Sequence, residues 1–256
     1  MCLLVLAHDV HPAYRLVLAT NRDEFFDRPA RPLAPWDDPP GIVAGRDLSA
    51  GGTWFGVDRR GRFGVLTNVR EPGAERQDAP TRGRLVVDYL AGTESAADYL
   101  ARLAGASEPF NGFNLIAGDA SQLGYHTNRE AGVRILTPGI YGLSNRALDT
   151  PWPKVIRGKA MLEDALRSRT LDPDRLLDGL HDPVEAPDDQ LPRTGVPLEW
   201  ERRLSAVFIE GDAYGTRCST VMLVDREERV EVVERTYYPD GRRPTTARAR
   251  FTLEHT

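Results

Sequence analysis

The second residue of the chain, Cys2, carries the side chain best suited to nucleophilic chemistry. It directly follows Met1, and cysteine is small enough that we expect Met1 to be removed, which leaves Cys2 as the N-terminus. A terminal cysteine carries a thiol and an α-amine on one residue. Because such an amine ordinarily has a pKa of about 7.7 to 8.0, it can accept the thiol proton near neutral pH. Nucleophile and general base then come from a single residue.

The residues after Cys2 predict a β-hairpin that brings further polar groups to it. An apolar run at 3–7 precedes turn residues at 8–12, and a second run at 14–19 is typical of a returning strand. The end of that second strand carries an amide, a cation and a carboxylate, in Asn21, Arg22 and Asp23. A simpler interpretation is also open: a cysteine near a terminus is often a small buried hydrophobe, and a charged triplet at the end of a strand often faces solvent.

Three more polar residues at predicted strand ends are candidates for the same site. Asn68 follows a hairpin of residues 53–67, and its side-chain amide could stabilise an oxyanion; the alternative is an Asn that ends a strand by bonding local backbone. Asn145 is a second candidate of this kind. Arg217 follows a Gly-containing turn and could bind a carboxylate or phosphate through two hydrogen bonds. Its alternative role is an ion pair, with Asp23 as one partner.

Hydrophobic periodicity indicates both strands and helices. Two helices are predicted at 84–90 and 93–103, with Thr93 as the N-cap of the second. Two more are expected at 151–166, with Val155 and Ile156 on its buried face, and at 172–180. Further segments are assigned as follows: a meander of strands at 113–145, a strand at 206–209, a Gly-containing stretch at 211–220 that leads into a hairpin of strands at 221–224 and 230–238, an edge strand at 248–253, a proline-rich loop at 28–41 and a long loop at 181–200.

Composition limits the class of protein. The chain has 256 residues, 41% hydrophobic and 28% charged, with a net charge of −5, which is ordinary for a globular protein and gives no case for nucleic-acid binding. No apolar run approaches a membrane span, and His8 and Asp9 interrupt the N-terminal apolar run early, unlike a signal peptide. We therefore expect a cytoplasmic protein without stable membrane insertion. Its oligomeric state stays open.

The two cysteines, Cys2 and Cys218, are not expected to form a disulfide in that compartment. Their spacing from histidines does not fit a zinc site, and no metal or resident cofactor is predicted. No composition break or internal repeat divides the chain, so residues 1–256 are predicted to form one domain.

Several blocks resemble the NRDE family, which includes the eukaryotic transport-and-Golgi-organisation protein. They are Met1-Cys2, Thr20–Glu24, Gly51–Gly56, Thr67–Arg70, Gly142–Asn145 and Tyr214–Arg217, in the same order as in the family. The family in turn resembles the cysteine branch of the N-terminal-nucleophile hydrolases, with choloylglycine hydrolase and penicillin V acylase. In that branch an Arg lies three residues before the Asp, where this chain has Thr20, and Arg22 is adjacent to Asp23 instead.

The resemblance implies an α+β fold, a four-layer αββα sandwich of two antiparallel sheets with helical outer layers. It also implies hydrolysis of non-peptide amide bonds in a small-molecule substrate. Cys2 would attack the carbonyl, Asn68 and Asn145 would polarise the oxyanion, and Arg22, Asp23 and Arg217 would orient the amine or bind an anionic group. Two alternatives stay open: a non-enzymatic carrier of a hydrophobic ligand, haem or lipid, in the same pocket, or a protein whose pocket is inactive. For haem, five His and three Met offer few axial ligands, and no Cys-x-x-Cys-His site exists.

Overall fold

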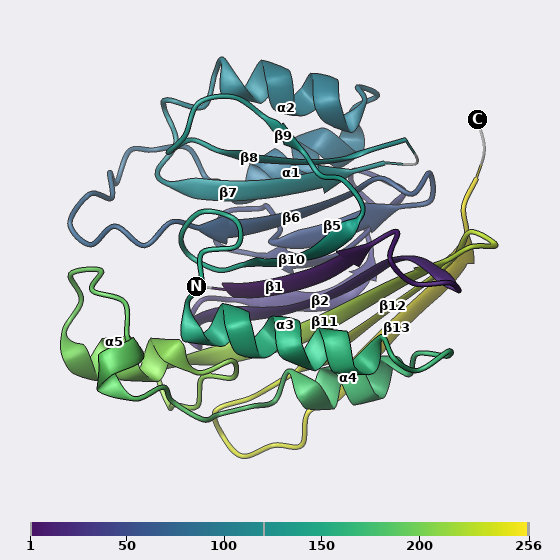
Figure 1. Ribbon diagram of the computed structural model, residues 1–256. Coiled ribbons are helices and arrows are strands. Elements are labelled where there is room, and N and C mark those ends of the chain that lie inside the picture. Colours follow the sequence, from purple (N-terminus) through teal and green to yellow (C-terminus); the bar gives the residue numbers. More distant parts are fainter. Residues whose placement is uncertain (1, 120, 255–256) are drawn as a thin grey trace.

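The computed structural model describes residues 2–119 and 121–254. Two antiparallel sheets face each other, and helices cover the outer face of each one (Figure 1). This arrangement confirms the predicted α+β sandwich of αββα type. The two predicted helix pairs form the opposite outer layers, as expected.

The first sheet is built on the predicted N-terminal hairpin. Its register places Cys2 opposite Arg22 and Leu3 opposite Asn21. The order in the sheet is β10-β1-β2-β11-β12-β13. The strands are β1 (Cys2–His8), β2 (Tyr14–Phe25), β10 (Gly139–Leu143), β11 (Tyr214–Asp225), β12 (Arg229–Thr236) and β13 (Thr245–Thr252).

The second sheet has the order β3-β4-β5-β6-β7-β8-β9. Its strands are β3 (Ala30–Pro35), β4 (Ile42–Asp47), β5 (Phe55–Asp58), β6 (Phe63–Asn68), β7 (Phe113–Gly118), β8 (Leu123–Thr127) and β9 (Arg134–Ile135). Two predictions for this region were wrong. The proline-rich loop contains β3, which tolerates prolines because it is an edge strand. The meander does not continue into β10, which instead crosses to the first sheet and pairs with β1.

The helices are α1 (Gly83–Ala91), α2 (Ala96–Ala104), α3 (Pro153–Ala165), α4 (Pro173–Gly179) and α5 (Leu198–Ser205), with a 3-10 turn at Asp188–Gln190. The N-cap of α2 is Ser95, whose hydroxyl accepts the Asp98 N–H, and not Thr93. The segment at 181–200, predicted as a loop, contains the 3-10 turn and the start of α5. The predicted strand at 206–209 belongs to neither sheet, and the Val207 carbonyl accepts a hydrogen bond from the Asn21 side chain.

The buried face of α3 also differs from the prediction. Ile156 is 55% exposed, whereas Lys154 is 1% exposed. Lys154, Gly158 and Leu162 are spaced four residues apart and share one helix face. Gly158 allows this face to approach β1 closely, since a Cβ there would lie 3.0 Å from a Val5 methyl and 3.1 Å from a Leu3 methyl. The close packing carries Lys154 down to the sheet.

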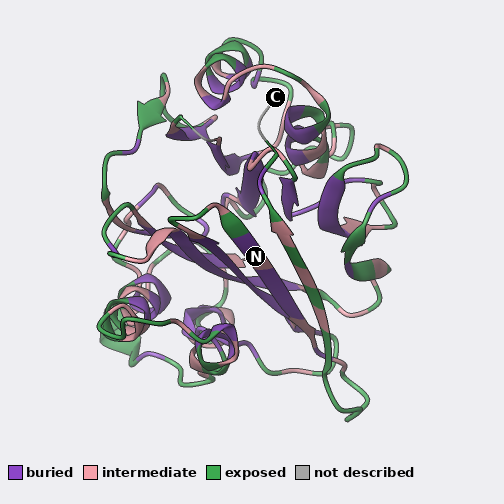
Figure 2. Ribbon diagram, turned by 90° about the vertical axis from the view of Figure 1, so that its right-hand side faces the viewer, coloured by how far each residue is buried: buried purple, intermediate pink, exposed green. Residues whose placement is uncertain are grey.

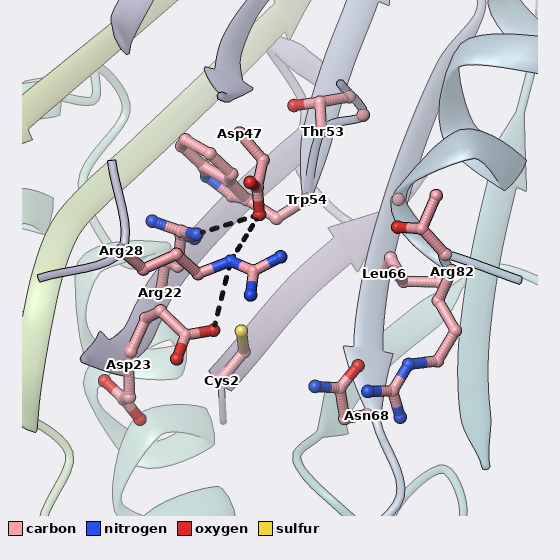
Figure 3. A pocket seen from close by; sticks show the side chains of 14 residues that line it. Cys2, Arg22, Asp23, Arg28, Asp47, Thr53, Trp54, Leu66, Asn68 and Arg82 are labelled. Carbon is pink, nitrogen blue, oxygen red and sulfur yellow. Dashed lines mark hydrogen bonds and ion pairs between the residues drawn. The ribbon is translucent and has the colours of Figure 1, made fainter. Parts of the chain in front are cut away.

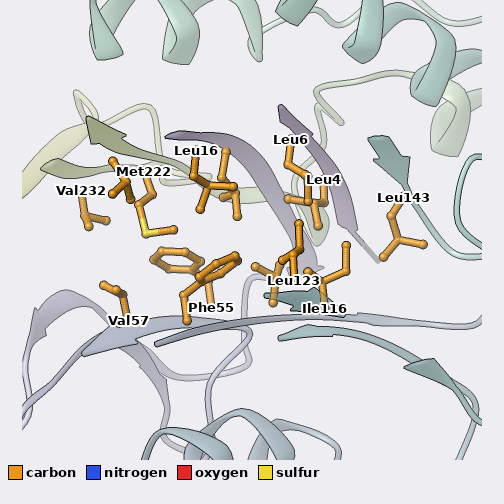
Figure 4. Close-up of a cluster of buried hydrophobic side chains, with 14 of the residues drawn as sticks. Leu4, Leu6, Leu16, Phe55, Val57, Ile116, Leu123, Leu143, Met222 and Val232 are labelled. Atoms are coloured by element: carbon orange, nitrogen blue, oxygen red, sulfur yellow. The ribbon is translucent and has the colours of Figure 1, made fainter. Parts of the chain in front are cut away.

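Leucine, valine and aromatic side chains fill the space between the sheets (Figure 4). Alternation along β1 sends Leu4 and Leu6 into this core and sends Leu3 and Val5 under α3 and α4. Figure 2 shows the resulting pattern, with buried strands inside and exposed outer faces on the helices. Each large apolar side chain buried here stabilises the fold by about 1.5 to 3 kcal/mol. This packing stabilises the sheet whose strand β1 begins with Cys2.

Candidate active site

A cleft of about 130 Å³ opens between the sheets beside the N-terminal strand. Figure 3 shows the Cys2 sulfur directed into this space, with Asn68 facing it from the end of β6 and Arg82 from the segment before α1. Charged and polar groups dominate the wall. The lining residues are Cys2, Arg22, Asp23, Glu24, Arg28, Asp47, Gly52, Thr53, Trp54, Leu66, Asn68, Thr81, Arg82 and Gly83.

Strand alternation places the thiol in the cleft, because Cys2 shares the inner face of β1 with Leu4 and Leu6. Burial raises the pKa of the Cys2 thiol, and the negative charge of Asp23 adds to this effect. The Asp23 main-chain N–H and the Arg22 guanidinium act in the opposite direction, without overcoming burial. The thiol therefore needs a base if it is to react near neutral pH.

Asp23 presents its carboxylate to the opposite face of the sheet from the thiol (Figure 3). Its Oδ1 accepts the Thr216 hydroxyl at 2.7 Å, and its Oδ2 lies 3.2 Å from the Lys154 ammonium. Both members of the Lys154–Asp23 ion pair are almost completely buried. The predicted ion pair of Asp23 with Arg217 is replaced by these contacts.

Arg22 faces the cleft and is fixed on two sides. Its guanidinium lies 4.1 Å from the centre of the Trp54 ring and 3.5 Å from Asp47. Asp47 also accepts a 2.7 Å hydrogen bond from Arg28. One carboxylate thus ties two cations to the rim, which orients their charge toward the cleft.

Asn21 lies outside the cleft. Its amide donates to the main-chain carbonyls of Leu180 at 3.1 Å and Val207 at 2.8 Å, and its oxygen accepts the Ser219 hydroxyl at 2.6 Å. It therefore braces β2 against the segments that follow α4 and α5.

The two predicted oxyanion residues are placed differently. Asn68 ends β6 and lines the cleft opposite Cys2. Asn145 is fully buried behind it and does not line the cleft. The Asn145 amide donates to the Asn68 carbonyl at 2.7 Å, and its oxygen accepts the Ser144 hydroxyl. Since Ser144 also donates to the Cys2 carbonyl at 2.9 Å, Ser144 and Asn145 join β1 to β6, the strand that carries Asn68.

Arg217 does not line the cleft either. The pairing of β11 with β2 shifts between Thr216 and Cys218, so that Arg217 is the extra residue of a bulge. Its guanidinium donates to the main-chain carbonyls of Phe25 at 2.6 Å and Arg28 at 2.9 Å. It holds the chain that leaves β2, at the point where Arg28 reaches the rim.

Comparison with known proteins identifies the family. The Transport and Golgi organisation 2 family matches residues 1–239. The chain belongs to this family. The mouse Transport and Golgi organization 2 homolog is 37% identical over 276 residues, covering 99% of this chain and 100% of the mouse protein. The Drosophila melanogaster Transport and Golgi organization protein 2 is 32% identical and covers 92% of each chain.

Solved structures share the fold of this family member. The mutant C2A conjugated bile acid hydrolase from Clostridium perfringens superposes with a TM-score of 0.53, covering 100% of this chain and 97% of that one. Sequence identity is 9%, so the likeness is one of architecture. This chain therefore shares the fold of that hydrolase.

The start of α1 closes the far side of the cleft in this family member. A Cβ on Gly52 would lie 2.4 Å from the main-chain carbon of Gly83, so only glycine permits this approach. Arg82 precedes the helix and donates to the Gly112 carbonyl at 2.9 Å. Burial lowers the pKa of the Arg82 guanidinium. Gly52, Thr53 and Trp54 thus form part of the cleft wall.

Sequence analysis missed Asp47, Arg82 and Lys154. Lys154 had a detectable signal, since a lysine in phase with Gly158 and Leu162 on a buried helix face requires a buried partner. Asp47 and Arg82 had none, because their place in the cleft depends on packing between sheets. Among the described residues, no group of His, Cys, Asp and Glu is arranged to hold a metal ion. None of the described helices is both long and apolar enough to cross a membrane.

Proposed function

We propose that this protein is a cysteine hydrolase that cleaves a non-peptide amide bond in a small molecule in the cytoplasm. The observation that carries the proposal is the thiol of Cys2, on the first strand, directed into a cleft that Asn68 lines from the opposite sheet. Membership of a family with this fold supports it, as does the bile acid hydrolase of the same fold, whose C2A mutant is altered at position 2 of that protein.

The chemistry requires removal of Met1. The α-amine of Cys2 then takes the thiol proton, and the sulfur attacks the carbonyl carbon of the amide. The Asn68 side chain donates to the oxyanion of the tetrahedral intermediate. The C–N bond breaks, the amine leaves with the proton, and an acyl thioester remains on Cys2. Water attacks the thioester, giving the acid and the free thiol.

The cleft wall indicates a polar substrate group near the reacting bond. Arg22, Arg28 and Arg82 bring positive charge, and Glu24 and Asp47 bring negative charge. A mixed wall of this kind suits an amide whose amine or acyl portion carries its own charge. Asn145 and Arg217 enter the proposal as residues that position Asn68 and Arg28, rather than as groups that touch the substrate.

The carrier alternative uses the same cleft for haem or lipid and needs no nucleophile. Both activities should be assayed on the same purified variants, with a tag only at the C-terminus. The hydrolase assay uses a panel of N-acylated amines and amino acids, and the carrier assay measures transfer of haem or a fluorescent lipid to vesicles. Circular dichroism confirms that each variant is folded.

As a hydrolase, the wild type should cleave at least one amide of the panel. Cys2→Ser should lose most turnover because a hydroxyl is a weaker nucleophile near neutral pH, and Cys2→Ala should lose all of it. Cys218→Ala is the matched control and should retain turnover. Hydrolysis that survives in Cys2→Ala, or ligand transfer by a wild type that cleaves no amide, would refute the proposal.

A further inference from the structure

Asp23, the acidic member of the buried Lys154–Asp23 ion pair, directly follows the β2 residue that pairs with Cys2. In the register of β1 on β2, Cys2 is opposite Arg22 and Leu3 is opposite Asn21. Moving from Cys2 toward the N-terminus therefore leads to the level of Asp23. Removal of Met1 converts this nitrogen into the free α-amine, next to the side of the sheet on which the Asp23 carboxylate lies.

A buried carboxylate alone at this position would disable the amine as a base. A neighbouring negative charge favours the ammonium form of an amine, and an ammonium group cannot accept the thiol proton. Lys154 places a positive charge 3.2 Å from Asp23 Oδ2, with its side chain 1% exposed. In such a poorly solvated position the opposing charges act strongly on their neighbours.

Other titratable groups interact with Asp23 or with Cys2 as well. Burial raises the pKa of Tyr214 well above its usual value, so this phenol is neutral near pH 7. Arg70 forms a buried ion pair with Glu201 at 2.8 Å and also interacts electrostatically with Asp23. The charged and titratable groups from the surrounding elements are Arg22 and Asp23 on β2, Tyr214 on β11, Lys154 on α3, Arg70 after β6 and Glu201 on α5.

We propose that Lys154 is a positioning residue that offsets the charge of Asp23 and so keeps the α-amine of processed Cys2 uncharged near neutral pH. Asp23, held by Thr216 and Lys154, remains as an acceptor that orients the amine. This inference rests on the proposed hydrolase function, because only a base needs an uncharged amine.

The experiment titrates the α-amine directly, without relying on turnover. All variants carry Cys2→Ala, so that no thiol titrates with the amine, and intact mass confirms removal of Met1. Trace acetylation with acetic anhydride across pH, followed by mass spectrometry of the N-terminal peptide, gives the titration midpoint. Lys154→Met should raise the midpoint by about one pH unit or more, since the positive charge is lost. Lys154→Arg, which keeps the charge, should leave it nearly unchanged.

A folded Lys154→Met variant with an unshifted midpoint would overturn the inference. If that variant does not fold, the uncharged pair Asp23→Asn with Lys154→Met replaces it, because removing both buried charges is far less destabilising than removing one. If Lys154 offsets the charge of Asp23, removing both charges should leave the titration midpoint of the α-amine close to that of the Cys2→Ala parent. A midpoint well below the parent would show that Asp23 acts without an offset from Lys154, and would overturn the inference. Absence of any amide hydrolysis refutes the hydrolase proposal and leaves this titration interpretable.

Discussion

The two cysteines occupy matched positions in one sheet, yet only one is placed to react. Cys2 and Cys218 both pair with Arg22, from the two strands that flank β2. Their Cα atoms are therefore about two strand spacings, or roughly 10 Å, apart, which is too far for a disulfide. Both are free thiols. Arg22 separates them on the inner face of the sheet.

The two cysteines differ in how exposed their side chains are and in whether a proton acceptor is available to the thiol. Cys2 is partly exposed in the cleft, whereas Cys218 is buried in the core between the sheets. Burial raises the pKa of the Cys218 thiol well above its usual value, and the neighbouring Glu234 carboxyl raises it further. Burial also raises the pKa of the Cys2 thiol, but processing would give that residue an amine of its own. The difference suggests that a proton acceptor and access to the cleft, rather than an acidic thiol, make a cysteine useful here.

The largest effect should come from making Cys2 resemble Cys218, a thiol without an adjacent amine. A short Gly-Ser extension at the N-terminus that cannot be removed should lower turnover of the amide by about 10⁴-fold, the upper range for loss of a general base. The measurement is kcat on the best substrate of the panel, with the same extension at the C-terminus as control. Full turnover by the N-terminally extended protein would show that the amine is not the base.

The second-largest effect should come from Asn68, because this residue lines the cleft opposite Cys2. Asn68→Ala should lower kcat by about 10²- to 10³-fold with a smaller change in KM, as expected for loss of an oxyanion donor. Steady-state kinetics on the folded variant check this. An effect confined to KM would instead make Asn68 a ground-state binding residue.

Arg217, which directly precedes Cys218, should contribute mainly to stability. Arg217→Ala removes the hydrogen bonds to the Phe25 and Arg28 carbonyls. Because the donor is charged, the free energy of unfolding should fall by about 2 kcal/mol, with little change in KM. Urea denaturation and kinetics on the same preparation measure both. A large rise in KM for anionic substrates with unchanged stability would support direct substrate binding, as the sequence predicted.

The smallest effect concerns the carboxyl beside Cys218. Glu234 accepts the Leu33 N–H at 2.7 Å and the Thr220 hydroxyl at 3.2 Å, and burial raises its pKa above the usual range. The folded state then binds more protons than the unfolded state between the two pKa values, so this group makes stability fall as pH rises through that window.

Glu234→Gln should therefore weaken the decline in stability from the usual glutamate pKa upward. Thermal unfolding of both proteins at a series of pH values measures the slopes, and turnover should stay unchanged because Glu234 does not line the cleft. A steeper decline in the variant would contradict the assigned direction.

Local signals explain what the sequence could predict. A hairpin depends on neighbouring residues, so the pairing of Cys2 with the Asn21–Asp23 segment followed from turn chemistry and alternation. The αββα architecture came from the family resemblance. Asn68 ends a strand of a second predicted hairpin, and the family resemblance favoured a role in the site over a local hydrogen bond to the backbone.

Contacts between distant segments could not be predicted in the same way. Lys154 and Asp23 are separated by 131 residues, and the close approach of α3 to β1 at Gly158 brings them together. The pattern of apolar residues predicted Ile156 on the buried face of α3. In the structure Lys154 is buried instead, and Ile156 is exposed. For Arg217, a one-residue bulge directs the guanidinium to main-chain carbonyls, and no pattern in the sequence specifies that bulge.

The central claim is that processed Cys2 is the reactive nucleophile, and intact mass spectrometry before and after brief iodoacetamide treatment tests it most directly. The protein carries only a C-terminal tag and is purified under reducing conditions. We predict a mass lower by one Met residue, with a single label on the Cys2 peptide and none on Cys218 until the protein is unfolded. Retention of Met1 in every chain, or faster labelling of Cys218 than of Cys2 in the folded protein, would contradict the claim.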